Sequence, residues 1–115
     1  MTYSKKGNFY IVTRHDSLLA VVLVRGVQVA SPVFKTLPPV YNFGNKLDPA
    51  KVLAAVQEGI AEANVTYGTD FQASEIHHVE DDARPETLYK QMVINLIKRI
   101  VTNGEFTESQ YKHAP

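Results

Sequence analysis

The sequence predicts a two-layer α+β domain, in which two helices cover one face of a four-stranded, mainly antiparallel sheet. The chain has 115 residues, a size at which one hydrophobic core commonly closes. Three strand-like segments precede the first of two segments with helical periodicity, which gives the order β-β-β-α-β-α. We expect a single domain over residues 1–115, with an N-terminal arm at residues 1–7 and a C-terminal tail at residues 105–115. Apolar residues make up 44% and charged residues 21% of the chain, which excludes a disordered, collagen-like or coiled-coil protein.

The first half of the chain has the pattern of an antiparallel meander. Residues 8–14 and 18–25 are rich in aromatic and β-branched side chains, and residues 15–17 between them favour a turn. The segment 18–25 is apolar on both alternating faces, so we expect a central strand that is covered on each side. A third strand is expected at residues 27–36, where Pro32 cannot donate to a ladder and favours an edge position or a bulge.

The first helix is expected to begin after Asp48. The Asp48 carboxylate can accept hydrogen bonds from the first backbone N–H groups, and Pro49 suits the first helical position. Apolar residues recur at helical spacing as far as about Asn64 and predict one buried face. Gly59 costs about 1 kcal/mol relative to alanine, which is tolerable if the helix lies very close to the sheet there. A fourth strand follows at residues 71–79.

The second helix is expected to begin at Pro85, and it carries more apolar surface than one core requires. Two apolar stripes run along it, formed by Leu88, Met92, Leu96 and Ile100 and by Tyr89, Val93, Ile97 and Val101. With Ile94 they cover an arc of about 240°, whereas a helix on one core needs little more than ~100°. A neighbouring subunit, the C-terminal tail or other elements of the same chain would cover the excess. The sequence favours the first, so Tyr89, Val93, Ile97 and Val101 are the predicted interface of a homo-oligomer, with a dimer preferred.

The charges cancel overall but are unevenly distributed. Twelve basic and twelve acidic residues give a net charge of zero, which argues against a nucleic-acid partner. Residues 1–57 carry seven basic and two acidic residues, residues 58–86 carry one and eight, and residues 87–115 carry four and two. The acidic zone either faces solvent or meets the basic zone of a second copy or of a basic partner.

The absence of cysteine and of a long apolar segment predicts a cytoplasmic location. A chain without cysteine has no disulfide, thiol nucleophile or thiolate metal site. The N-terminus has no signal-peptide pattern, and the longest apolar stretch, residues 18–24, is far shorter than the ~20 residues that cross a bilayer. We therefore expect no membrane partner.

One dense polar cluster lies where the fourth strand leads into the second helix. It comprises Glu75, His77, His78, Glu80, Asp81 and Asp82. Neighbouring residues of a strand point to opposite faces, so His77 and His78 cannot bind one metal ion together. His77 with Glu75, or His78 with Glu80, could still act as a pair. A metal site requires three or more ligands and no second cluster supplies them, so we predict no metal and no cofactor.

The same cluster supplies candidates for acid–base catalysis. His78 would act as the acid or base, and Glu80 or Asp82 would orient its ring, because imidazole titrates near neutral pH. Tyr41 or Tyr67 would contact the substrate. In the alternative interpretation, an aspartate of the cluster caps the second helix and the histidines lie at the sheet edge.

The loop at residues 37–47 is the second candidate region. It carries prolines, asparagines and two aromatic residues, a composition typical of a loop with its own packing. Tyr41 and Phe43, with Tyr67 and His77, are the candidate ligand-binding residues. Alternatively, Tyr41 and Phe43 only close the end of the core.

The run from Asp48 through Glu80-Asp81-Asp82 to Lys98-Arg99 resembles small uncharacterised bacterial α+β proteins carried on mobile gene cassettes, such as those of integrons. In that run a helix, a strand, an acidic turn and an amphipathic helix follow one another over about half of the chain. The resemblance implies a cytoplasmic, oligomeric accessory protein and carries over no functional residues.

Three functions are compatible with the sequence. The favoured one is a binding or interaction module, in which the acidic turn and the aromatic loop line a cleft for a small molecule or a basic protein. The second is a small cofactor-independent enzyme with a histidine–carboxylate pair, and the third is an acidic inhibitor or immunity-type protein. The sequence lacks the GxGxxG, GxxxxGK[ST], GxSxG and HExxH motifs, so none of the common nucleotide-binding or hydrolase signatures decides among them.

Overall fold

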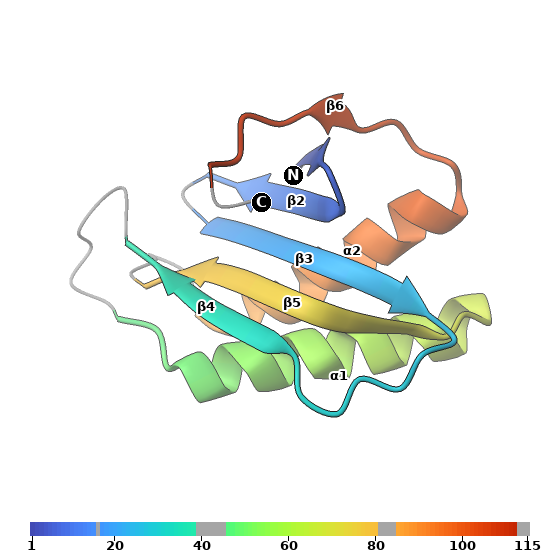
Figure 1. The fold of residues 1–115 in the computed structure, drawn as a ribbon, viewed down its shortest axis with the longest axis horizontal. Helices are drawn as coiled ribbons and strands as arrows, with labels where there is room; N and C mark the ends of the chain where they lie inside the picture. The colour runs from blue at the N-terminus through green and yellow to red at the C-terminus, as the bar shows by residue number, and fades with distance from the viewer. Residues whose placement is uncertain (16, 39–45, 81–84, 113–115) are drawn as a thin grey trace.

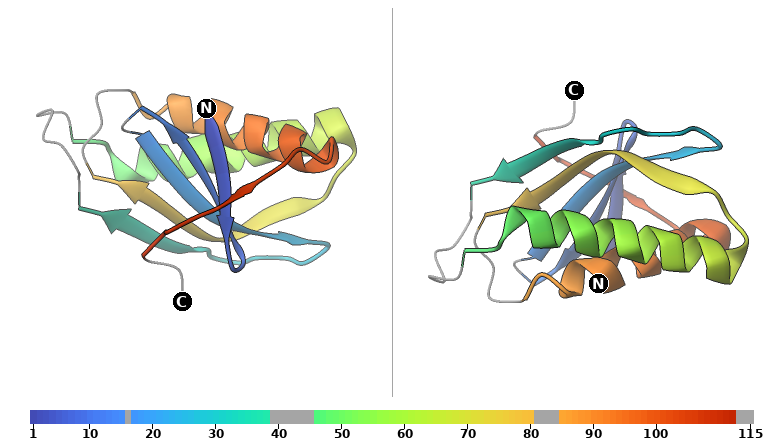
Figure 2. Two further views of the ribbon diagram at one scale, coloured as in Figure 1. Left: turned by 90° about the horizontal axis from the view of Figure 1, so that it is seen from above. Right: turned by 90° about the horizontal axis from the view of Figure 1, so that it is seen from below.

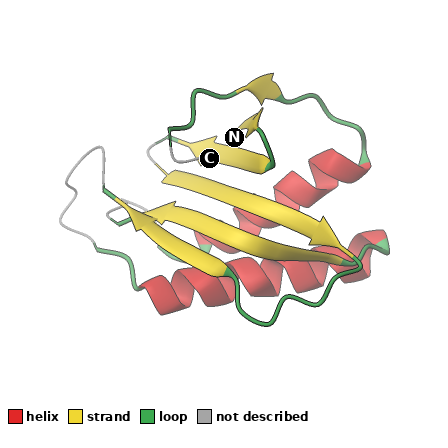
Figure 3. Ribbon diagram, in the orientation of Figure 1, coloured by secondary structure: helices red, strands yellow, loops and turns green. Residues whose placement is uncertain are grey.

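Two helices lie on one face of a mixed six-stranded sheet (Figures 1 and 3). The computed structural model describes residues 1–15, 17–38, 46–80 and 85–112. The helices are α1 (Pro49–Tyr67) and α2 (Leu88–Val101). The strands are β1 (Thr2–Lys6), β2 (Phe9–Arg14), β3 (Ser17–Arg25), β4 (Val33–Leu37), β5 (Phe71–Val79) and β6 (Thr107–Glu108). Within the described residues, neither helix combines the length and apolarity needed to cross a bilayer.

The strands are arranged in the order β4-β5-β3-β2-β1-β6. The antiparallel pairing of β2 with β3 agrees with the expectation, and β1 extends the meander on the side of β2. The third predicted strand is β4, which is an edge strand beginning directly after Pro32. It pairs in parallel with β5, because α1 returns the chain across the helices' side of the sheet.

Two short segments account for most of the difference from the predicted four-stranded sheet. Residues 1–7, which the sequence predicted as an arm, contain β1, all five residues of which pair with β2. The C-terminal tail contains β6, whose two residues pair in parallel with Ser4 and Lys5. Both segments are largely polar, so their sequences lack the apolar alternation by which the other strands were recognised.

The two faces of the sheet have different covers. The helix face carries Val12, Leu19, Val21 and Ile76, which belong to the main core beneath α1 and α2. The opposite face, here called the tail face, carries a small buried cluster of Phe9, Ile11 and Ala20 that packs against Tyr111 of the C-terminal tail. Figure 2 shows both helices on the same side of the sheet and the C-terminal segment running past β1. The prediction that the central strand is covered on both faces is therefore confirmed.

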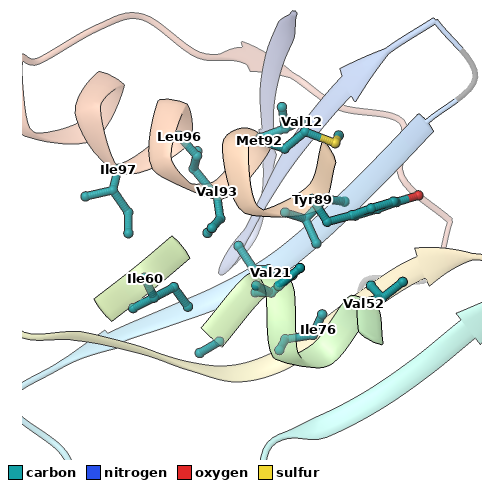
Figure 4. Close-up of a cluster of buried hydrophobic side chains, with 14 of the residues drawn as sticks. Val12, Val21, Val52, Ile60, Ile76, Tyr89, Met92, Val93, Leu96 and Ile97 are labelled. Atoms are coloured by element: carbon teal, nitrogen blue, oxygen red, sulfur yellow. The ribbon is translucent and has the colours of Figure 1, made fainter. Parts of the chain in front are cut away.

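The apolar side chains of α2 are buried within the single chain, which corrects the interface prediction. Tyr89, Val93 and Ile97 have no exposed surface, and Val101 is half-buried against the same cluster. α2 packs on β2 and β3 with one side and on α1 with the other (Figure 4). The wide apolar arc of α2 is thus covered by the sheet on one side and by α1 on the other. Cover by other elements of the same chain was one of the alternatives that the sequence left open.

The two helices are in close contact at Gly59. A Cβ atom at this position would lie 2.5 Å from Val93 Cγ1 and 2.7 Å from the Lys90 carbonyl oxygen. Gly59 therefore allows α1 to approach α2, whereas the sequence suggested an approach to the sheet. Beside this contact, the Lys90 ammonium lies 3.1 Å from carboxylate oxygens of both Glu58 and Glu62.

The helix ends are set by local hydrogen bonds. The Asp48 carboxylate accepts from the Ala50 N–H, as predicted, and α1 ends at Gly68, which has a left-handed φ of 65°. α2 begins at Leu88 rather than at Pro85, because Pro85 and Glu86 form the turn that precedes it. The Glu86 carboxylate accepts a hydrogen bond from the Asp48 N–H, which lowers the pKa of Glu86.

Candidate functional site

The structure separates the residues that the sequence grouped as a candidate site. Tyr41, Phe43 and Asp82 lie outside the described residues. Tyr67 is at the carboxyl end of α1, close to where β5 begins, whereas His78 lies near the end of β5. Tyr67 therefore lies near the start of β5 and His78 near its end, so the two residues are separated by the length of the strand.

His78 belongs to the helix face. It lies opposite Leu19 of β3, and its side chain is completely buried. Its Nε2 atom is 3.0 Å from the Thr36 hydroxyl, and its ring lies 5.1 Å from the ring of Phe34 and 6.1 Å from that of Tyr89. Glu80, its predicted partner, lies 3.5 Å from the Lys46 ammonium. The surroundings of His78 are those of a polar residue accommodated in a hydrophobic core.

His77 lies on the tail face, between a carboxylate and a phenol. Its Nε2 atom is 2.5 Å from Glu75 Oε2, and its Nδ1 atom is 2.5 Å from the Tyr111 hydroxyl. Since a carboxylate can only accept, the Nε2–H donates to Glu75. In the neutral ring, Nδ1 then accepts from the Tyr111 O–H. We call this hydrogen-bonded series Tyr111, His77 and Glu75 the tail-face relay.

The alternation of β5 and the path of the tail explain why the relay forms. Glu75 and His77 are two residues apart on one strand and so share a face, a pairing that the sequence identified as possible. Tyr111 was missed, because it lies 34 residues from His77 on a tail without periodic pattern. The rings of Phe9 and Tyr111 pack at 4.9 Å and 5.8 Å from the His77 ring. The His77 side chain is consequently fully buried.

Burial keeps the phenol of the relay protonated. The pKa of Tyr111 is raised well above the ordinary value of 10.0, first by burial and second by the negative charge of Glu75. A neutral phenol is a hydrogen-bond donor to the ring, and it is a poor nucleophile. Solvent reaches both ends of the relay, because 24% of the Glu75 side chain is exposed and Tyr111 is half-buried, whereas His77 between them is fully buried.

A hollow of about 310 Å³ opens beside Glu75. Its lining includes Lys6, Phe9, Val22, Ser74 and Glu75. A β-bulge forms the wall of the hollow: Val22 pairs with Glu75 and Leu23 pairs with Ala73, so that Ser74 is the additional residue. Bulges re-aim the side chains next to them and recur beside binding sites. The bulge thus places Glu75 at the edge of a half-open, partly apolar hollow.

A second hollow, of about 380 Å³, lies between α1, the start of β5 and residues 29–32. Three of its polar side chains, those of Asn64, Asp70 and Gln72, have partners in the chain. The Asn64 side chain accepts a hydrogen bond from the Phe71 N–H and donates one to the Phe71 carbonyl. Gln72 Oε1 accepts from the Val29 N–H. The Asp70 Oδ1 atom lies 3.6 Å from Arg25 Nε. These groups hold neighbouring elements together, so this hollow is the weaker candidate.

A metal centre is not supported by the described part of the chain, where no group of three or more His, Cys, Asp or Glu residues is placed to hold an ion. His77 and His78 lie on opposite faces, as the alternation of the strand requires.

Comparisons with known proteins give no independent guide to the site: no protein-family model, no curated protein and no solved structure matches the chain. The functional argument depends on the geometry described above.

Proposed function

We propose that the protein binds a small zwitterionic molecule, of the amino-acid type, in the hollow beside Glu75. The observation that carries the proposal is that a carboxylate and an ammonium group, from Glu75 and Lys6, line one hollow together with the apolar side chains of Phe9 and Val22. This makes the protein a binding module, the function that the sequence favoured, with a different set of residues.

Each part of such a ligand has a complementary group in the hollow. The Glu75 carboxylate would accept hydrogen bonds from the ligand's ammonium group, and Lys6 would pair with its carboxylate. The apolar part of the ligand would contact Phe9 and Val22. The bond from His77 to Glu75 Oε2 fixes the orientation of the carboxylate before the ligand arrives, which reduces the entropy lost on binding.

A titration with amino acids tests this function. We expect chemical-shift changes at Lys6 and Glu75 on addition of a zwitterion, and smaller changes with the matching simple amine or carboxylic acid. Glu75→Gln keeps an acceptor for His77 and removes the charge. It should weaken binding roughly tenfold or more, since hydrogen bonds to charged groups contribute about 1.5–3 kcal/mol.

Glu80→Gln is the matched control, because it removes the same charge from a carboxylate that pairs with Lys46 elsewhere on the surface. It should leave the affinity unchanged. Equal losses in both variants would show that only the overall charge of the protein matters and would contradict the proposed site.

The tail-face relay favours acid–base catalysis as a second candidate function. A hydroxyl, an imidazole and a carboxylate in series can pass a proton along the chain, and the carboxylate end faces the hollow. Glu75 would then remove a proton from the carbon next to a carbonyl group of a bound substrate. Incubation with 2-oxo acids in D₂O would show deuterium uptake that is lost in Glu75→Gln. Uptake at the same rate in the variant would dismiss the hypothesis.

The ion pairs of the acidic zone bear on the third function, an acidic inhibitor. Its described carboxylates have partners within the chain: Glu58 and Glu62 with Lys90, Asp70 with Arg25, Glu75 with His77, Glu80 with Lys46, and Glu86 with the Asp48 N–H. This internal pairing supports a binding module more than a polyanion mimic. The homodimer, the cytoplasmic location and the origin on a mobile gene cassette stay predictions from the sequence.

A further inference from the structure

The C-terminal tail consists of an anchored root and a lightly held tip. The root is Phe106, whose ring lies 5.1 Å from the ring of Tyr10 and 6.5 Å from that of Tyr3. The Arg99 guanidinium lies over both Tyr3 and Phe106, and its Nε–H donates to the Glu105 carbonyl at 2.7 Å. The root is therefore packed against the main core and the end of α2.

The tip, residues 107–111, has fewer attachments. Only Thr107 and Glu108 pair with β1, and both are exposed. The Ser109 N–H donates to the Lys5 carbonyl at 2.9 Å, and two residues later Tyr111 inserts its hydroxyl at His77. A segment with so few backbone bonds opens locally at a small free-energy cost compared with global unfolding.

The surface beneath the tip has the parts of a strand-addition site. The outer edge of β1 supplies backbone donors and acceptors, and the tail-face cluster of Phe9, Ile11 and Ala20 supplies an apolar floor. The His77 ring offers a nitrogen at the bottom of a pocket that a tyrosine fits. Peptide recognition by strand addition uses this combination: backbone bonds give affinity and a side-chain pocket gives specificity.

We propose that this surface, formed by the edge of β1, the tail-face cluster and His77, is a docking site for an extended, acidic, tyrosine-bearing segment of a partner protein, which the tip of the tail occupies in the isolated chain. The tail indicates the features that such a partner segment needs. It pairs in parallel with β1 and places a tyrosine three residues after the second paired position. Lys5 of β1 lies in register with Glu108 of the tail, so residues of opposite charge are neighbours at this edge.

The docking proposal does not rest on small-ligand binding in the hollow. The two sites share Lys6 and Phe9, but the hollow also needs the charge of Glu75, whereas docking also needs the backbone edge of β1 and the Nδ1 side of His77. Loss of zwitterion binding in Glu75→Gln would therefore leave the docking proposal intact, and failure of docking would leave the ligand-binding proposal intact.

A peptide added in trans tests the proposal on the full-length chain. The variant Tyr111→Ala vacates the pocket while the Phe106 root remains in place. A fluorescent peptide with the sequence of residues 105–112 (EFTESQYK) should bind this variant, as measured by anisotropy. Its affinity for the wild-type chain should be at least tenfold weaker, because there the tip competes. A peptide in which the tyrosine is replaced by alanine is the matched control and should bind neither chain.

Several outcomes would overturn the proposal. Absence of binding to Tyr111→Ala would do so, provided that the circular dichroism spectrum shows a folded variant. If the variant is unfolded, unlabelled peptide is added at millimolar concentration to the isotope-labelled wild-type chain. Unchanged NMR signals of Ser109 and Tyr111, which displacement of the tip must alter, would then reject docking. Equal binding of the two peptides would reject the tyrosine pocket. Self-association of the wild-type chain without peptide, lost in Tyr111→Ala, would instead identify the occupant as the tail of a second copy.

Discussion

His77 and His78 are neighbours in β5, both are fully buried, and they have opposite environments. His78 is enclosed by the rings of Phe34 and Tyr89 and by the Thr36 hydroxyl, on the face of the sheet that the two helices cover. His77 is enclosed by a phenol and a carboxylate, beneath a tail attached by a two-residue strand. The comparison shows that complete burial does not distinguish a residue beneath the helix layer from a residue beneath a short terminal segment.

The largest difference is expected from truncating the two histidines. His78→Ala leaves a cavity in the main core and should lower the free energy of unfolding by about 3 kcal/mol. His77→Ala should cost less, because Glu75 and the half-buried Tyr111 can regain water as the tip detaches. Urea denaturation of both variants measures the difference. An equal or larger loss in His77→Ala would mean that the tail is as firmly attached as the helices.

Gly59→Ala tests the rigidity of the helix layer without touching either histidine. The added methyl group would lie 2.5 Å from Val93 Cγ1 and 2.7 Å from a backbone oxygen, so the helices must separate. We expect a loss of about 2 kcal/mol, the usual range for an overpacked core. Ala61→Gly, at an exposed position of α1, is the control and reports helix propensity alone, about 1 kcal/mol. Stabilisation by Gly59→Ala would show that α1 and α2 are not in close contact.

Tyr111→Phe removes one hydroxyl from the tail face. The loss in global stability should be about 1 kcal/mol or less, the net contribution of a typical hydrogen bond. The local effect should be clearer, because the tip is released while the core remains folded. Hydrogen exchange of the Ser109 N–H, which donates to the Lys5 carbonyl, should accelerate, and exchange at β3 should not. Acceleration at both sites would show that the tail and the core unfold as one unit.

The helix layer was largely predictable from the sequence, and the tail face was not. Periodicity and end signals identified β5 from Phe71 to Val79 and the start of α1 at Pro49, since both properties are local. The width of the apolar arc on α2 was correctly recognised, but the sequence does not record whether the same chain or another one covers Val93 and Ile97.

The candidate site depended on contacts between distant segments. Alternation predicts that Glu75 and His77 share a face, and it says nothing of which segment closes that face. Tyr111 lies on a tail whose composition is that of a solvated segment, and β1 is too polar to be recognised as a strand. The pattern of residue types is equally compatible with either histidine as the acid or base, so the assignment of that role to His78 with Glu80 stays a prediction.

High pH gives the smallest effect and the one most specific to the tail face. The pKa of Tyr111 is raised in the folded chain, so below the ordinary value of 10.0 both the docked and the released tip hold the proton, and docking has its full stability. Above that value the released phenol loses its proton first, and docking weakens as the pH rises. Glu75, His77 and, from β4, Lys35, which pairs in register with His77, are the charged or titratable groups near it. Because the chain has six tyrosines, the difference in phenolate absorbance between the wild type and Tyr111→Phe isolates this one. We expect this phenol to titrate well above the ordinary value of 10.0 while the fold persists, and titration at the ordinary value would mean that the phenol is not held on His77.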